Sequence, residues 1–140
     1  MTHPCAELVA RCFAARTTSH LAHLSTSSYA QHMALGDFYG DIASSADEFA
    51  ECYMGVFGKL STNDFPAIRL STAEPITQLS DLRIWIAQNR EECCGAYSEQ
   101  GDKDGKKAES NDVDCTELAN LIDNILAVID RALYRLKFLK

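Results

Sequence analysis

Apolar residues recur every three to four positions through four stretches of this sequence, and prolines occur only at positions 4, 66 and 75. That period places apolar side chains along one face of an α-helix. It predicts helices at about 4–24, 28–56, 75–97 and 114–139. On the first helix we expect the inward side to include Leu8, Val9, Cys12, Phe13, His20 and Leu24. The chain has 140 residues, enough for one self-sufficient core. We therefore expect an all-α protein, with residues 1–140 forming a single four-helix domain.

The connections between these helices suggest a topology. Residues 25–28 read STSS, a short turn that makes the first two helices an antiparallel hairpin. The 57–74 connection has 18 residues and no helical pattern. When extended it spans up to about 60 Å, more than the roughly 43 Å of the 28–56 helix. We therefore expect a long crossover between the second and third helices, as in a ferritin-like four-helix bundle. The alternative is a plain up-down bundle with a decorated loop.

Composition indicates a globular chain, with 46% hydrophobic and 24% charged residues. No run approaches the roughly 18 apolar residues of a membrane span, and the beginning of the sequence lacks a signal-peptide pattern. We expect a cytoplasmic protein with no membrane contact. The net charge of −7 makes DNA binding unexpected. The last ten residues are basic, which suits a helix C-terminus and could alternatively be an electrostatic contact. The polar segment 98–112 is expected to be mobile.

Six cysteines stand at positions 5, 12, 52, 93, 94 and 115, with no CxxC spacing. A zinc knuckle is therefore not expected. We expect Cys12 and Cys52 to be small core residues. The alternative is that Cys93, Cys94 and Cys115 trap a metal ion or oxidise.

Histidines and acids flank the apolar stripe of the 28–56 helix. His32 lies at one margin of the stripe, and Asp47 and Glu51 fall on the same side. Three other acids fall on the opposite, solvated face: Asp37, Asp41 and Glu48. His32 and Asp47 are fifteen residues apart, about 22 Å along the axis, and so cannot bind one ion within a single helix.

Three small residues occupy the margin between His32 and Asp47: Gly36, Gly40 and Ala43. They allow another helix to approach closely. If that helix is its own copy, packed antiparallel about a two-fold axis, His32 of one chain lies near Asp47 and Glu51 of the other. Imidazole and carboxylate ligands together suit Fe(II). The sequence thus predicts a homo-oligomer, at least a two-fold dimer, with iron sites between subunits. The alternative is a solvated acidic helix edge with incidental histidines.

The strings AHL (22–24), YAQH (29–32) and DEFAE (47–51) resemble the Dps branch of the ferritin superfamily, and short phage-encoded Dps-like proteins in particular. The resemblance implies an iron-oxidising site between two subunits, in an oligomer that could be a larger shell. It implies His23, His32, Asp47 and Glu51 as metal ligands. For a phage-encoded protein the location would be the host cytoplasm.

The sequence departs from the family pattern in several places. Leu24 replaces the tryptophan that follows the first histidine, and the turn is about three residues shorter, so spacing alone would select His20 in place of His23. Gly36 stands where the family has an aspartate. The lysine-rich N-terminal arm is also absent from these residues. Two hypotheses follow: a Dps-like protein that binds iron and has ferroxidase-type activity, or a non-enzymatic helical oligomer, structural or adaptor, without metal chemistry.

Overall fold

The computed structural model describes residues 3–94 and 116–140. Four α-helices make up most of this part: α1 (Pro4–Ser25), α2 (Tyr29–Phe57), α3 (Pro75–Cys93) and α4 (Thr116–Phe138). A short 3₁₀ helix, η1 (Thr62–Asp64), follows α2, and the described ranges contain no strand. The prediction of an all-α four-helix protein is confirmed. The expected mobile segment 98–112 and the expected helical positions 95–97 and 114–115 lie outside the described residues.

The helix ends follow from local sequence. Pro4 and Pro75 occupy the first turns of α1 and α3, where the missing N–H of proline costs nothing. The Ser28 hydroxyl caps α2 by accepting a hydrogen bond from the Gln31 backbone N–H at 3.2 Å. Gly58 ends α2 with a φ of 96°, a conformation that only glycine adopts readily. The turn between α1 and α2 is therefore short, because Ser28, the last residue of STSS, is already the cap of α2.

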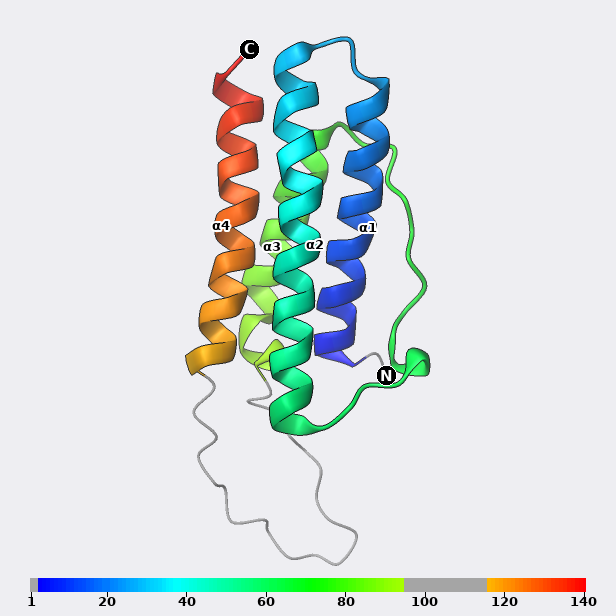
Figure 1. Ribbon diagram of the computed structural model, residues 1–140, viewed down its shortest axis with the longest axis vertical. Helices are drawn as coiled ribbons and strands as arrows, with labels where there is room; N and C mark the ends of the chain where they lie inside the picture. The colour runs from blue at the N-terminus through cyan, green and yellow to red at the C-terminus, as the bar shows by residue number, and fades with distance from the viewer. Residues whose placement is uncertain (1–2, 95–115) are drawn as a thin grey trace, which may run out of the picture.

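Each helix packs antiparallel to two neighbours. α1 contacts α2 and α3, and α4 contacts the same two helices from the other side (Figure 1). The ion pairs Arg83–Asp130 and Arg90–Asp123 show the opposed directions of α3 and α4, because rising numbers on one helix meet falling numbers on the other. As α1 also runs opposite to both α2 and α3, these last two point the same way (Figure 1).

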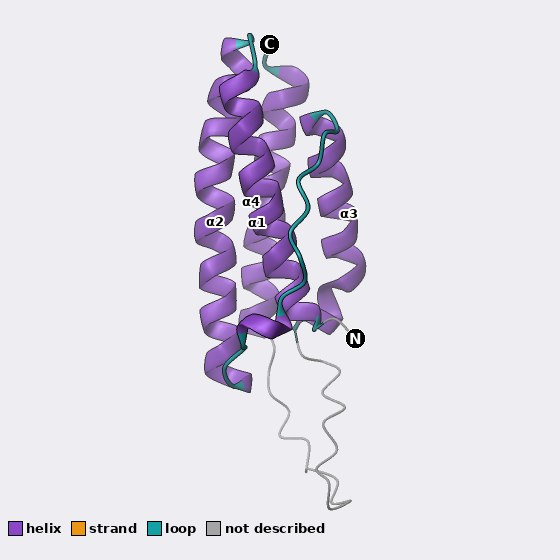
Figure 2. Ribbon diagram, turned by 90° about the vertical axis from the view of Figure 1, so that its right-hand side faces the viewer, coloured by secondary structure: helices purple, strands orange, loops and turns teal. Residues whose placement is uncertain are grey.

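Residues 58–74 connect the end of α2 to the start of α3. The segment runs along the outside of the bundle, beside α1 and α3 (Figures 1 and 2). Near its end the Ser71 backbone N–H donates to the Thr18 hydroxyl of α1 at 3.3 Å. The connection thus follows the bundle surface from one end towards the other.

The core lies between the four helices, and the predicted stripe of α2 is buried in it. Its members are Leu35, Phe38, Ile42, Ala46, Phe49 and Tyr53. Two expectations were wrong. Leu24 is 68% exposed, because it lies in the last turn of α1, near the hairpin end. Cys52 is also exposed, on the outer side of α2. None of the described helices is long and apolar enough to cross a bilayer.

Candidate functional site

His23 and His32 form a reciprocal pair where α1 turns into α2. The Nδ1 of His23 lies 2.6 Å from the backbone oxygen of His32, and the Nδ1 of His32 lies 2.8 Å from the backbone oxygen of His23. Their rings stack with centroids 3.7 Å apart and an 18° angle between the planes. Two histidines nine residues apart in sequence thus join the last turn of α1 to the first turn of α2.

These hydrogen bonds determine which ring nitrogen is available to a ligand. A carbonyl oxygen only accepts, so both Nδ1 atoms must bear the proton. In a neutral ring the lone pair is then on Nε2. Metal-binding histidines in proteins commonly have this arrangement, with the second nitrogen donating to a backbone carbonyl or a carboxylate. The His23–His32 pair therefore has the tautomers that metal binding through Nε2 requires.

The stacking limits what this pair can bind. A metal ion bound through Nε2 lies in the plane of its imidazole ring. Because the two rings are nearly parallel and 3.7 Å apart, their lone pairs do not converge on one point. In this conformation each histidine can bind its own ion, and the two cannot chelate a single one.

His20 lies one turn before His23 and contacts a residue that the sequence did not single out. Its ring stacks on the Tyr39 phenol, with centroids 4.0 Å apart and planes at 13°. Tyr39 also meets the edge of His23 at 5.4 Å, and His20 lies 6.1 Å from His23. Tyr39 stands two turns after His32 on the α2 helix, and this spacing is the signal that would have placed it on the same face.

Gly36 provides the room for His23. A Cβ atom built at this position would lie 3.0 Å from Cε1 and 3.2 Å from Nδ1 of the His23 ring. Both distances are shorter than an ordinary van der Waals contact. The glycine at the position where a Dps-like pattern has an aspartate is therefore explained by packing: the histidine ring fills that space.

The acids do not join the histidines within one chain. Asp47 and Glu51 are both exposed on α2, several turns below His32. In the ranges 3–94 and 116–140, no three His, Cys, Asp or Glu side chains come close enough to hold a metal ion. Of the acids expected on the solvated face, Asp37 forms an ion pair with Arg135 of α4 at 2.5 Å.

The buried cysteines lie away from His20, His23 and His32, towards the N-terminal end of α1. Cys5, Cys12 and Cys93 are almost fully buried, and the Cys93 thiol donates to the Pro4 carbonyl at 3.4 Å. Burial, with a smaller contribution from the nearby Cys93, raises the pKa of Cys12 to about 12. Burial also raises the pKa of Cys93 to about 12, with a smaller contribution from Cys94. These thiols stay protonated and serve as core residues. Cys115 lies outside the described residues.

The fold and site together define a small four-helix protein with a histidine–tyrosine cluster at its α1–α2 hairpin. The chain belongs to a family of unknown function, DUF5856, whose pattern matches residues 23–136. The match includes His23, His32, Asp47 and Glu51 and begins after His20. No curated protein and no solved structure matches the chain.

Proposed function

We propose that this chain is a Dps-like protein of the ferritin superfamily that binds Fe(II) between two subunits. The parallel directions of α2 and α3, with residues 58–74 beside the bundle, support a ferritin-like topology with a long crossover (Figure 1). The observation that supports iron binding best is the pair of Nδ1 hydrogen bonds, which leaves Nε2 of His23 and His32 for a metal ion.

The proposed site needs a second copy of the chain. His32 is fifteen residues from Asp47, about 22 Å along α2, so one chain cannot bring them together. Between them Gly40 has no atom within 4 Å of the position where a Cβ would stand. A two-fold axis at this open margin would bring Asp47 and Glu51 of a second copy towards His32.

Iron would be the substrate at this site. One imidazole nitrogen and two carboxylates form a mixed ligand set that suits Fe(II), and the carboxylates offset the extra charge of Fe(III). Two Fe(II) ions give one electron each to hydrogen peroxide, which takes up two protons and leaves as two water molecules. The stacked rings are consistent with separate ions, one on each histidine. His20, packed on Tyr39, would be an alternative ligand to His23.

Anaerobic titration with Fe(II), followed by peroxide, tests this proposal. The wild-type protein should bind Fe(II) in saturable fashion and develop ferric absorbance on oxidation. His32→Ala and Glu51→Ala should each weaken binding at least about tenfold, the typical loss when a ligand or its partner is removed. Asp41→Ala and Glu48→Ala are matched controls from the outer face of α2 and should bind normally. Equal iron binding by all five proteins would refute the site.

A non-enzymatic helical oligomer, acting as a structural or adaptor protein, is the second candidate. It is favoured by the contacts that His23 and His32 make within the chain. Their rings stack on each other, and the Nδ1 of each donates to the backbone oxygen of the other. In that case the pair serves to join α1 to α2. His32→Ala would then lower the melting temperature, and wild-type protein would show no saturable Fe(II) binding.

A further inference from the structure

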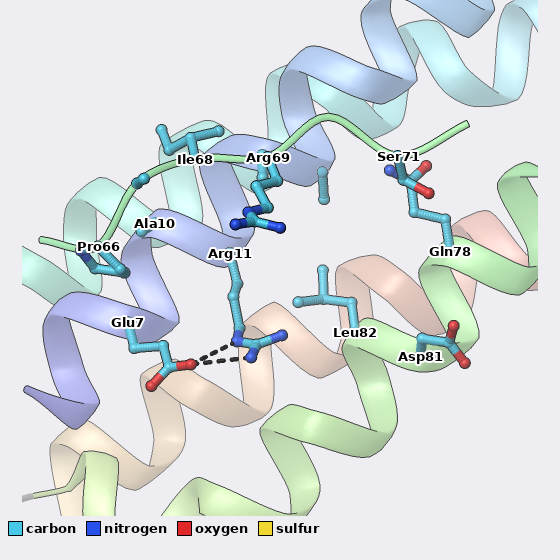
Figure 3. Close-up of a pocket in the computed structure, with 13 residues that line it drawn as sticks. Glu7, Ala10, Arg11, Pro66, Ile68, Arg69, Ser71, Gln78, Asp81 and Leu82 are labelled. Carbon is cyan, nitrogen blue, oxygen red and sulfur yellow. Dashed lines mark hydrogen bonds and ion pairs between the residues drawn. The ribbon is translucent and has the colours of Figure 1, made fainter. Parts of the chain in front are cut away.

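A second candidate site lies on the other side of α1, in a groove under the 58–74 segment. The groove has a volume of about 330 Å³ and lies between α1, α3 and residues 66–71 (Figure 3). Its size is at the lower end of the range for small-molecule sites. No residue of the histidine cluster or the proposed iron site lines it.

Residues 66–71 form the roof of the groove and are anchored at both ends. Phe65, just before the roof, packs against the hydrophobic core. At the other end, the backbone N–H of Ser71 donates to the Thr18 hydroxyl of α1 at 3.3 Å. The intervening residues bridge a floor of small and apolar side chains, among them Ala10, Ala14 and Leu82. The space is therefore held open by anchored neighbours.

Two arginines line the groove, and they differ in their partners. Arg11 donates from Nε and from a terminal nitrogen to the Glu7 carboxylate at 3.1 and 2.9 Å, and it lies 4.4 Å over the Trp85 ring. Arg69 forms no hydrogen bond or ion pair with any residue of the ranges 3–94 and 116–140. Figure 3 shows its guanidinium directed from the roof into the groove, above Arg11. The exposed Arg69 thus brings a guanidinium without a partner in these ranges to a groove lined by both polar and apolar side chains, in a protein of net charge −7.

We propose that this groove binds a small organic anion. The Arg69 guanidinium would hold a carboxylate or phosphate group, whose geometry matches its planar donors. An aliphatic or aromatic body would lie on Ala10, Ala14 and Leu82. Asp81 also lines the groove and disfavours a ligand with more than one anionic group. The Gln78 amide at the same wall is a neutral donor for a second polar group.

Ligand-detected NMR on the full chain tests the proposal, with four probes. Benzoate and phenyl phosphate represent the two sources of the anionic group. Benzyl alcohol supplies the apolar body alone, and inorganic phosphate supplies the charge alone. We expect saturable binding of benzoate or phenyl phosphate, at least about tenfold tighter than either control, because a charge-assisted hydrogen bond adds to the apolar contact. Whichever of the two binds more tightly identifies the anionic group.

Variants of the lining residues test whether the probes bind in this groove. Arg69→Gln should weaken it at least about tenfold, while Arg16→Gln, an exposed arginine of α1 outside the groove, should leave it unchanged. Ala14→Leu should block it by filling the floor. Arg69 is exposed on the connection, so circular dichroism should show Arg69→Gln fully folded. The proposal is overturned if no probe saturates, if benzyl alcohol binds as well as benzoate, or if Arg69→Gln binds like wild type.

Discussion

A Cβ atom on Gly36 would lie 3.0 Å from Cε1 of His23, so the histidine ring of α1 packs directly against the α2 backbone and leaves no room for a side chain there. The ring is held there by its stack on His32 and by its Nδ1 hydrogen bond. It cannot yield to a larger residue without loss of these contacts. The close approach of α1 and α2 near the hairpin therefore depends on glycine at this position.

Gly36→Ala and Gly40→Ala should differ in stability, although both replace a helical glycine. Alanine in a helix is favoured over glycine by about 1 kcal/mol. Gly40 has nothing within 4 Å of the new methyl, so Gly40→Ala should raise the free energy of unfolding by roughly that amount. At Gly36 the methyl meets His23, and overpacking costs about 1–3 kcal/mol. Urea unfolding should show Gly36→Ala to be the less stable variant.

The His23→Ala background is the control for this difference. Without the imidazole ring, Gly36→Ala should stabilise as Gly40→Ala does, about 1 kcal/mol. If Gly36→Ala remains destabilising when His23 is absent, the contact with the ring is not its cause.

The stripe of α2 could be predicted because a 29-residue amphipathic helix repeats its pattern many times. Cys52 was misplaced because cysteine is usually buried, although its position on the helix points away from that stripe. Leu24 was misplaced because periodicity does not reveal where a helix extends past its neighbours. Figure 2 shows that α3 begins well below the end where α1 meets α2.

The histidine pair was only half predictable. The resemblance named His23, or His20 in its place, together with His32 as ligands, and a short turn joins their helices. The sequence did not predict the stacking, the exchanged carbonyl contacts or the filling of the Gly36 space. These depend on how far α1 and α2 are rotated about their axes, which no local pattern determines. Whether Asp47 and Glu51 meet a histidine depends on a second chain and stays a prediction.

Thiol reactivity should follow burial. Cys52 is exposed and should be alkylated by iodoacetamide in the native protein, whereas Cys5, Cys12 and Cys93 should react only after unfolding. Peptide mass spectrometry reports the alkylated positions, and Cys52→Ser should abolish fast labelling of the peptide that contains this position.

The free energy of unfolding should depend on pH through Cys12. Burial raises the pKa of this thiol from 9.0 to about 12. The folded state therefore holds the proton more tightly than the unfolded state, and the contribution to stability that is complete below pH 9 is lost as pH rises towards 12.

A buried phenylalanine of the core should contribute much more to the free energy of unfolding than an exposed one near the end of α4. Phe49 is fully buried, and Phe49→Ala should cost about 3–5 kcal/mol of unfolding free energy. Phe138 is 71% exposed near the end of α4, and Phe138→Ala should change stability by less than about 0.5 kcal/mol. Thermal melts followed by circular dichroism measure both. Similar losses in the two variants would contradict the packing described for α2 and α4.

Gly40→Leu should weaken self-association if the small-residue margin of α2 is a subunit interface. The predicted margin comprises Gly36, Gly40 and Ala43. The His23 ring of the same chain fills the space at Gly36, whereas Gly40 is exposed and leaves room for a second helix. A leucine there fits the monomer and obstructs a second helix. Sedimentation velocity should show wild type as at least a dimer and Gly40→Leu as a smaller species. The change Asp41→Leu, at an exposed position on the opposite face of α2, is a control of similar size. An unchanged mass for Gly40→Leu would exclude this margin as the interface.

Mixed dimers should reveal whether the proposed iron site spans two chains. His32→Ala and Glu51→Ala each remove one half of both sites in a homodimer, so neither homodimer should bind Fe(II) well. In a heterodimer the two lesions meet at one end of the two-fold interface, and the other end pairs an intact His32 with an intact Glu51. Fe(II) titration of the purified heterodimer, isolated with two different affinity tags, should therefore recover one site for every two sites in the wild-type dimer. Ligands contributed by a single chain would give one damaged site in each subunit and no recovery, and that outcome would exclude the intersubunit arrangement.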